Sequence, residues 1–162
     1  MGYVVCGFGH RNIFDGIESA DEILVLKESL TLLLETIIEN EESPVFMTGM
    51  RGEFDNLFAS VVRILKENNK SIKLVLVEPY FSDALNKYKD YFEVMYDSII
   101  IPDEIAGAYP KKAITLRNKW MVEQSDSIVS YVNKEQGGAY NTLKYAKSLN
   151  KTIYNLGDLD FE

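Results

Sequence analysis

The stretch SIVSYVNKEQGGAYNTLKYAKSLNKTIYNL (127–156) decides the fold class. It begins with a nearly continuous apolar run at 127–133, passes through a glycine pair into a helical pattern at 139–149, and ends in a second apolar run at 151–156. Short apolar runs of this kind are typical of strands covered on both faces. A helix between two of them makes a right-handed crossover between parallel strands. The stretch therefore predicts a strand–helix–strand unit of a parallel sheet.

The same alternation runs through the rest of the chain. Apolar runs rich in β-branched residues predict further strands at 3–9, 44–49, 73–80 and 98–102. Helical periodicity predicts helices at 20–41, 53–69 and 111–126, with a weaker helical segment at 82–95. We therefore expect one α/β domain over residues 1–162, a Rossmann-like three-layer sandwich. Its central sheet would be mainly parallel, with five to six strands and helices on both faces.

Composition narrows the classes of partner. The 25 acidic and 17 basic residues give a net charge of −8, which disfavours nucleic acid and anionic lipid as partners. The single cysteine, Cys6, cannot form an intramolecular disulfide, and no apolar run approaches the ~20 residues of a membrane span. We expect a cytoplasmic protein that binds a small molecule and neither nucleic acid nor membrane.

Ligands of such sheets bind beyond the carboxyl ends of the strands, so the strand-to-helix turns are the places to search. The first turn is CGFGHRN (6–12), where glycine allows close approach and His10 and Arg11 offer a donor and a positive charge. The alternative is an ordinary strand-end turn with solvated side chains, because a lone G-x-G is a weak signal.

The second turn is TGMRGEFDN (48–56). Gly49 and Gly52 bracket the start of a helix, whose unpaired N–H groups and positive dipole end can bind an anion. Asp55 lies in the first turn of that helix. It either stabilises the helix end or accepts hydrogen bonds from a sugar hydroxyl, and the sequence does not separate the two.

The third turn contains Gly137 and Gly138, which leave backbone N–H groups open to an anion. Asn141 and Thr142 can add side-chain donors, and the helical pattern places Thr142 on the side that faces the sheet. A turn that needs glycine, with Asn and Thr as helix caps, explains the stretch equally well.

Arg117 is the fourth candidate. It projects into an apolar stripe on the helix at 111–126, between Ile114 and Met121. A guanidinium there must be paired, must extend to solvent, or must meet an anionic ligand. Such a rigid mount suits an arginine that binds phosphate with two hydrogen bonds.

Together these motifs resemble a known family. CGFGHRN, TGMRGEFDNLFA and above all RNKWMVEQSDSIVSYVNKEQGGAYNTLKYAKSLNKTIYNL (117–156) are similar to the YpsA-like branch of the SLOG superfamily, whose relatives include the LOG and DprA proteins. The resemblance covers nearly the whole chain. Its specific part is the C-terminal third, and residues 81–110 match only loosely.

The resemblance implies a SLOG-like Rossmannoid domain that binds a nucleotide or nucleotide-derived (phosphoribosyl) ligand at its Gly-rich turns, as a binding or sensor module. No cofactor and no metal is required. The implied ligand-binding residues are Gly9, His10, Arg11, Gly49, Gly52, Asp55, Arg117, Asn118, Gly137, Gly138, Asn141 and Thr142.

One departure from the family bears on catalysis. LOG-type phosphoribohydrolases carry P-G-G-x-G-T-x-x-E, whose glutamate works on the ribose, whereas alignment on Thr142 places Lys144 and Tyr145 where acidic residues would be. Neither side chain stabilises a cationic sugar as a carboxylate does. Asp55 and Glu53 are the remaining catalytic candidates. The missing glutamate thus favours a binding function. One alternative is a nucleoside-monophosphate phosphoribohydrolase (N-glycosidase) or related sugar transferase, and a weaker one is DprA-like handling of single-stranded DNA.

The long first helix predicts the assembly. Apolar residues occupy much of its circumference, so it is either deeply buried or shared with a second subunit. We expect a homodimer.

Overall fold

The structure is a computed structural model and describes residues 2–14, 20–157 and 159. Its strands are β1 (Val4–Gly9), β2 (Val45–Thr48), β3 (Lys73–Val77), β4 (Ser98–Ile100), β5 (Ser127–Tyr131) and β6 (Thr152–Asn155). Its helices are α1 (Ala20–Asn40), α2 (Glu53–Lys66), α3 (Asp83–Lys87), α4 (Lys89–Met95), α5 (Pro110–Gln124) and α6 (Gly138–Ser148), with a 3-10 turn at Asp103–Ile105.

The six strands form one sheet in the order β4-β3-β2-β1-β5-β6, and every neighbouring pair is parallel. Cys6 on the central strand β1 lies opposite Met47 on β2 and Ile128 on β5. The chain builds outward from β1 to β4 and then returns to lay β5 on the other side of β1. The strand order therefore reverses between β1 and β5, where ligands of such sheets bind.

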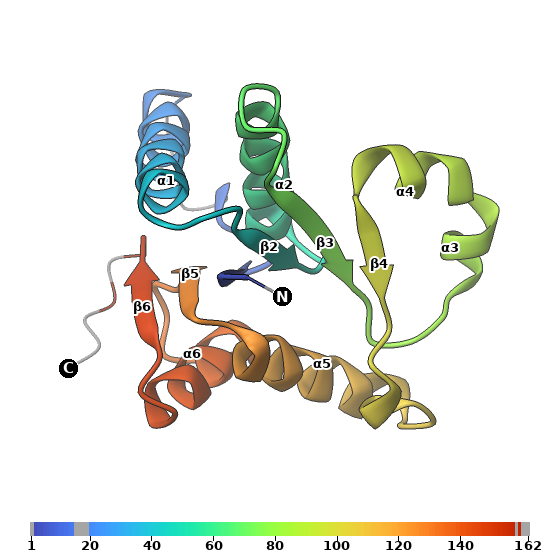
Figure 1. Cartoon of the computed structure of the whole chain (residues 1–162). Coiled ribbons are helices and arrows are strands. Elements are labelled where there is room, and N and C mark those ends of the chain that lie inside the picture. Colours follow the sequence, from blue (N-terminus) through green and yellow to red (C-terminus); the bar gives the residue numbers. More distant parts are fainter. Residues whose placement is uncertain (1, 15–19, 158, 160–162) are drawn as a thin grey trace.

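Helices cover both faces of the sheet, which confirms the three-layer prediction (Figure 1). Val5 packs into the core formed with α1 and α2, whereas Val4 and Cys6 pack into the core formed with α5 and α6. This opposite placement follows from the two-residue period of a strand. The predicted α/β sandwich with a sheet of five to six strands is therefore correct, and the sheet has six strands, all parallel.

The glycines of β1 allow α2 to lie close against the sheet. A Cβ added to Gly7 would lie 2.6 Å from ring atoms of Phe58, and one added to Gly9 would lie 2.8 Å from Phe54. Both phenylalanines are fully buried. The motif CGFG thus has a packing cause that is independent of any ligand.

The segment expected as one helix at 82–95 is two short helices, and the expectation was wrong on this point. α3 and α4 meet at Tyr88, whose φ of −110° and ψ of 33° leave the helical region. Each helix buries one large apolar side chain, Leu85 in α3 and Phe92 in α4, and both join the core on the α1 and α2 face. The change of direction at Tyr88 accompanies the packing of both helices onto that core.

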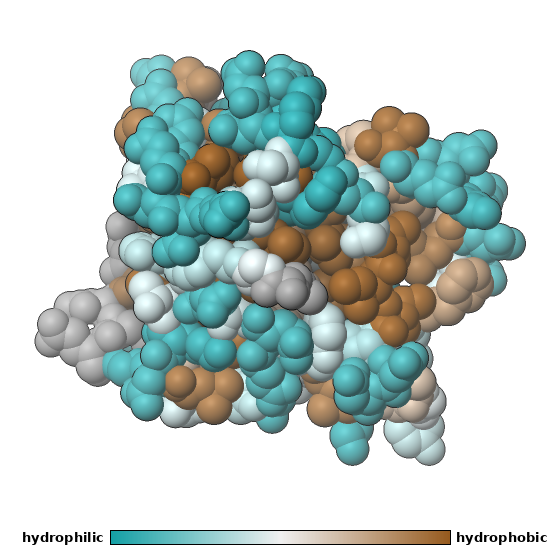
Figure 2. Space-filling model, in the orientation of Figure 1, coloured by the Kyte–Doolittle hydropathy of each residue, from teal (hydrophilic) through white to brown (hydrophobic). Residues whose placement is uncertain are grey.

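The first helix is half covered. Leu26, Leu30, Leu34 and Ile37 form its buried stripe, whereas three apolar side chains remain exposed, at 54% for Leu24, 60% for Val25 and 65% for Leu32. Hydrophobic colour also gathers around β3 and β4, while hydrophilic residues dominate the visible faces of α1 and α2 (Figure 2).

In residues 2–14, 20–157 and 159, no helix is long and apolar enough to cross a membrane. No group of three or more His, Cys, Asp or Glu side chains there is arranged to hold a metal ion.

Candidate functional site

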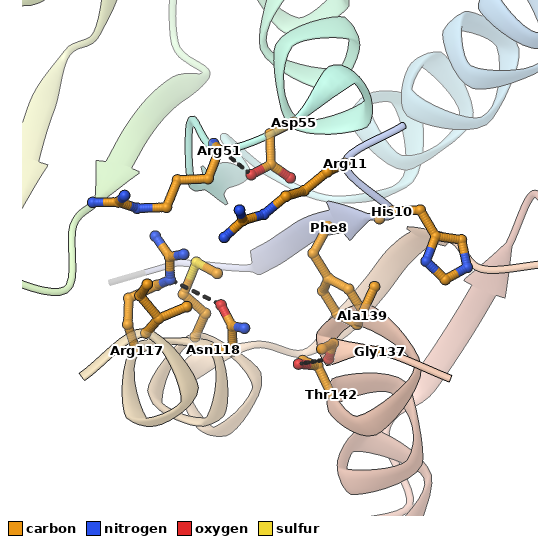
Figure 3. Close-up of a pocket in the computed structure, with 14 residues that line it drawn as sticks. Phe8, His10, Arg11, Arg51, Asp55, Arg117, Asn118, Gly137, Ala139 and Thr142 are labelled. Atoms are coloured by element: carbon orange, nitrogen blue, oxygen red, sulfur yellow. Dashed lines mark hydrogen bonds between the residues drawn. The ribbon is translucent and has the colours of Figure 1, made fainter. Parts of the chain in front are cut away.

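A pocket of about 360 Å³ opens at the carboxyl end of β1, where the strand order reverses (Figure 3). Four segments far apart in the sequence form it: the end of β1 with its loop, the start of α2, the middle of α5 and the start of α6. Its lining residues are Phe8, Gly9, His10, Arg11, Arg51, Asp55, Ile114, Arg117, Asn118, Met121, Gly137, Gly138, Ala139 and Thr142.

His10 lies at the rim of this pocket and is fixed by two hydrogen bonds. Its backbone N–H donates to the carbonyl of Tyr131 at 3.1 Å, and its Nε2 accepts from the N–H of Asn133 at 3.2 Å. Burial lowers the pKa of His10, and the ammonium of Lys134 lowers it further. The ring is therefore neutral at pH 7, and its proton is on Nδ1 because Nε2 is an acceptor.

Arg11 supplies a positive charge, which also acts on Asp55 and lowers the pKa of that carboxyl against the larger effect of burial. Its carbonyl accepts the N–H of Glu53 at 2.8 Å, and a Cβ on Gly52 would lie 2.6 Å from its Cα, so backbone contact fixes the loop. The side chain is exposed, extends into the pocket (Figure 3), and makes no hydrogen bond with any described residue. Arg11 is thus free to bind an anion.

Asp55 brings a carboxylate into the same pocket. It is 9% exposed, and its Oδ2 accepts the N–H of Arg51 at 3.2 Å. Burial raises the pKa of Asp55 to about 6, against the opposing effect of the Arg117 guanidinium. Both roles considered for Asp55 are compatible with this geometry, since it holds the turn before α2 and also faces the pocket.

Arg117 is buried, with 3% of its surface exposed. Its Nη1 donates to the carbonyl of Val77 at 2.8 Å and its Nε donates to Oδ1 of Asn118 at 2.8 Å. A Cβ on Gly49 would lie 2.8 Å from Nη1 of Arg117, so that glycine makes room for the guanidinium. Arg117 therefore does not extend to solvent; the protein holds it in place at the pocket wall.

The start of α6 forms the opposite wall. Gly137 has φ of 93°, a left-handed conformation that favours glycine, and no side chain caps the helix. The hydroxyl of Thr142 donates to the carbonyl of Gly138 at 2.7 Å, and Thr142 is buried as predicted. The first-turn N–H groups of α6 thus have no intrahelical acceptor beside the pocket.

Several predicted residues lie outside the pocket lining: Gly49, Gly52, Asn141 and Glu53. The two glycines serve close contacts, and Asn141 is exposed. Oε1 of Glu53 accepts the N–H of Ile13 at 3.1 Å. Of the two catalytic candidates, the pocket lining includes Asp55 and not Glu53.

The positions that replace the LOG-type acidic residues are also outside the lining. Lys144 lies over the ring of Tyr140, with 5.4 Å between its Nζ and the ring centroid. The hydroxyl of Tyr145 donates to Oε2 of Glu123 at 2.5 Å. Both side chains have structural partners on the surface.

The sequence reasoning missed Phe8 and Arg51, which line the pocket, and Glu78, which pairs with Arg51. Glu78 is fully buried and pairs with Arg51, with 3.4 Å between its Oε2 and Nη2 of Arg51. A signal was present for both charges, since Arg51 stands between two turn glycines and Glu78 directly follows an apolar strand. What the sequence could not give was their pairing.

Comparison with known proteins decides the family. A family model described as YspA SLOG matches residues 4–162. The chain belongs to the YspA SLOG family. A relative of this SLOG chain is the "Uncharacterized SPbeta prophage-derived protein YoqJ" of Bacillus subtilis (strain 168), 28% identical over 159 aligned positions that cover 86% of this chain and 92% of YoqJ.

Solved structures share the fold of this SLOG chain. DNA processing protein A (DprA) of Helicobacter pylori, described for its single-stranded DNA binding mode, matches with a TM-score of 0.61 and 16% identity over 99% of this chain and 67% of that one. DprA of Streptococcus pneumoniae matches with a TM-score of 0.59 and 16% identity over 94% of this chain. The SLOG chain spans 50% of the pneumococcal protein.

Proposed function

We propose that this SLOG protein is a binding or sensor module for a nucleotide or nucleotide-derived (phosphoribosyl) ligand, which occupies the pocket between β1 and β5. The observation that carries the proposal is the charge of the pocket. Three arginines and one carboxylate line it, in a chain whose net charge is −8. A positive pocket in an acidic protein selects a small anion.

Each part of a nucleotide has a matching group. Arg11 and the first turn of α6 attract a phosphate, because the guanidinium and the helix N–H groups are open donors. Asp55 accepts hydrogen bonds from sugar hydroxyls. Phe8, Ile114 and Met121 provide apolar wall for a base. Neither a metal nor a further cofactor is needed for binding of this kind.

The main alternative is an N-glycosidase that hydrolyses a nucleoside monophosphate. The observation in its favour is a buried carboxylate, Asp55, in a pocket beside arginines. In that reaction the bond between C1′ and the base breaks, water adds its oxygen to C1′, and the base takes a proton. An ionised Asp55 would stabilise the cationic sugar. A related sugar transferase would use the same step with another acceptor.

Handling of single-stranded DNA is a weaker alternative. It rests on the fold shared with DprA, and shared fold does not establish shared function. The net charge of −8 opposes it, since strand binding depends on cationic contacts with many phosphates.

One experiment separates the first two functions. The protein is incubated with a panel of nucleoside 5′-monophosphates, and both thermal stabilisation and free base are measured. We expect stabilisation by a cognate nucleotide without free base. Arg11→Ala should weaken binding by roughly 1.5–3 kcal/mol, the scale of a charge-assisted hydrogen bond, while Lys112→Ala on the outer surface of α5 should not.

The outcomes are distinct. If the wild type releases free base and Asp55→Asn does not, the protein is a glycosidase and the binding-module proposal is wrong. If Arg11→Ala and Lys112→Ala weaken nucleotide binding equally, the effect is one of overall charge, and the pocket is not the binding site. Arg117→Ala is a poorer test, because it also leaves the Val77 carbonyl without its hydrogen bond.

We also propose a homodimer through α1, on which Leu24, Val25 and Leu32 are exposed. Light scattering after gel filtration tests it, and a monomer mass at high concentration would contradict it.

A further inference from the structure

The ion pair between Arg51 and Glu78 is incomplete on both sides. Its one contact joins Nη2 of Arg51 to Oε2 of Glu78 at 3.4 Å. Nε of Arg51 and Oε1 of Glu78 are both buried without a hydrogen-bond partner. Among the described residues, Ser127 Oγ is the one other buried side-chain atom in that state. Two of the three such atoms therefore belong to a single pair beside the pocket.

This arrangement is costly for a resting pair. An arginine and a carboxylate normally satisfy each other through two parallel hydrogen bonds. Here each group keeps one buried polar atom unpaired, which costs free energy for both. Glu78 is fully buried, whereas the Arg51 side chain is 27% exposed and lines the pocket. Of the two partners, Arg51 is the one that can move toward a ligand.

The other arginines of the pocket have different roles. Arg117 is bound to the Val77 carbonyl and to Asn118, and it is buried. Arg11 lies on the loop after β1 and its side chain makes no hydrogen bond with a described residue, and the start of α6 lines another wall of the pocket (Figure 3). A first phosphate needs only Arg11 and α6. Arg51 then remains as a second cationic group with an unused donor.

We propose that Arg51 binds the second of two linked phosphates, so that the ligand is a diphosphate such as a nucleoside diphosphate or its ester. The inference rests on the proposed function and deepens it. On binding, Arg51 leaves Glu78 and turns toward the pocket, where the oxygens of the second phosphate accept from Nε and Nη2. The ring of Tyr80, 5.3 Å from the Arg51 guanidinium carbon, faces the guanidinium in the resting position.

The test compares matched probes that differ by one phosphate. Calorimetric titrations use adenosine 5′-monophosphate against the diphosphate, and inorganic phosphate against pyrophosphate as a pair without a base. The variants are Arg51→Ala, Glu78→Gln and the control Lys112→Ala. Circular dichroism checks that each variant is folded.

Wild type should bind the diphosphate probe of each pair more tightly. Arg51→Ala should weaken diphosphate binding by roughly tenfold or more, and should weaken monophosphate binding by a clearly smaller factor, because a monophosphate loses only the general positive charge of Arg51 and no direct contact. Glu78→Gln removes the competing carboxylate, so it should raise the ratio of diphosphate to monophosphate affinity. Lys112→Ala should leave that ratio unchanged.

Three results overturn the inference. They are equal wild-type affinity for both members of each pair, equal weakening of both by Arg51→Ala, or an unchanged ratio in Glu78→Gln. With monophosphate binding intact, each leaves the proposed function standing. If wild type binds no member of either pair nor any other nucleoside mono- or diphosphate, the proposed function itself fails. If Arg51→Ala does not fold, the ratio of diphosphate to monophosphate affinity is measured in Arg51→Gln and Glu78→Gln and tests the inference in the same way.

Discussion

Asp55 shows how one residue can serve structure and site together. Its carboxylate accepts the backbone N–H of Arg51, which fixes the turn before α2, and it also lines the pocket. The sequence placed an acid at this helix start but could not separate those roles, because both use the same position in the first turn. Gly49, which we predicted as a ligand-binding residue, lies outside the pocket lining and makes room for Arg117.

The raised pKa of Asp55 predicts how stability depends on pH. Its pKa is about 6 in the folded protein, above the unfolded value of 3.8, so the folded state binds a proton first as pH falls. The free energy of unfolding of wild type, relative to Asp55→Asn, should therefore rise as pH falls from about 7 to about 4, by up to about 3 kcal/mol. Urea unfolding of both proteins over this range measures it. If the difference in unfolding free energy between the two proteins stays constant, or decreases as the pH is lowered, the raised pKa of Asp55 is contradicted.

At the scale of elements, the close packing of α2 against β1 depends on glycines of the strand. The apolar runs and the helical period predicted both elements, and only the register of their contact was missing from the sequence. In that register the Phe58 ring lies in the space that a side chain at position 7 would occupy, so the packing requires glycine there. The break at Tyr88 was not predicted for a similar reason: it depends on how α3 and α4 pack on the core, which a helical period does not encode.

Gly7→Ala should destabilise the protein by roughly 1–3 kcal/mol, the scale of an overpacked core. The added Cβ would lie 2.6 Å from the Phe58 ring, which is fully buried and has no space to retreat. Gly138→Ala is the matched control, since nothing lies within 4 Å of a Cβ there. It should change stability by less than about 0.5 kcal/mol. Equal denaturation midpoints for wild type and Gly7→Ala would contradict the packing account.

At the scale of the whole molecule, sequence alternation was enough to predict the sheet and its two helical layers. It also pointed to strand-to-helix turns that line the pocket, because strand ends of a parallel sheet meet at one edge. The partners of the charged residues could not be predicted, since Arg51 and Glu78 are 27 positions apart and come together only across β2 and β3. Sequence patterns identify turns, whereas charge pairing needs the register of neighbouring strands.

A second cavity provides an internal comparison. A groove of about 380 Å³ beside β4 is lined by Phe81, Leu85, Asn86, Lys89, Glu93, Ile99 and Ile101. Its volume resembles that of the pocket at the switch point. It has one lysine and one glutamate in place of the three arginines, so it gives a nucleotide no comparable charge.

The most direct test of the central claim is a nuclear magnetic resonance titration of the ¹⁵N-labelled protein with nucleoside 5′-mono- and diphosphates. If the ligand binds between β1 and β5, the amide signals of Gly9, Arg11, Gly137 and Gly138 should shift with saturation. Those of Phe81 and Leu85 in the second groove should stay in place. Shifts centred on the second groove, or no shift with any nucleotide of the panel, would contradict the account.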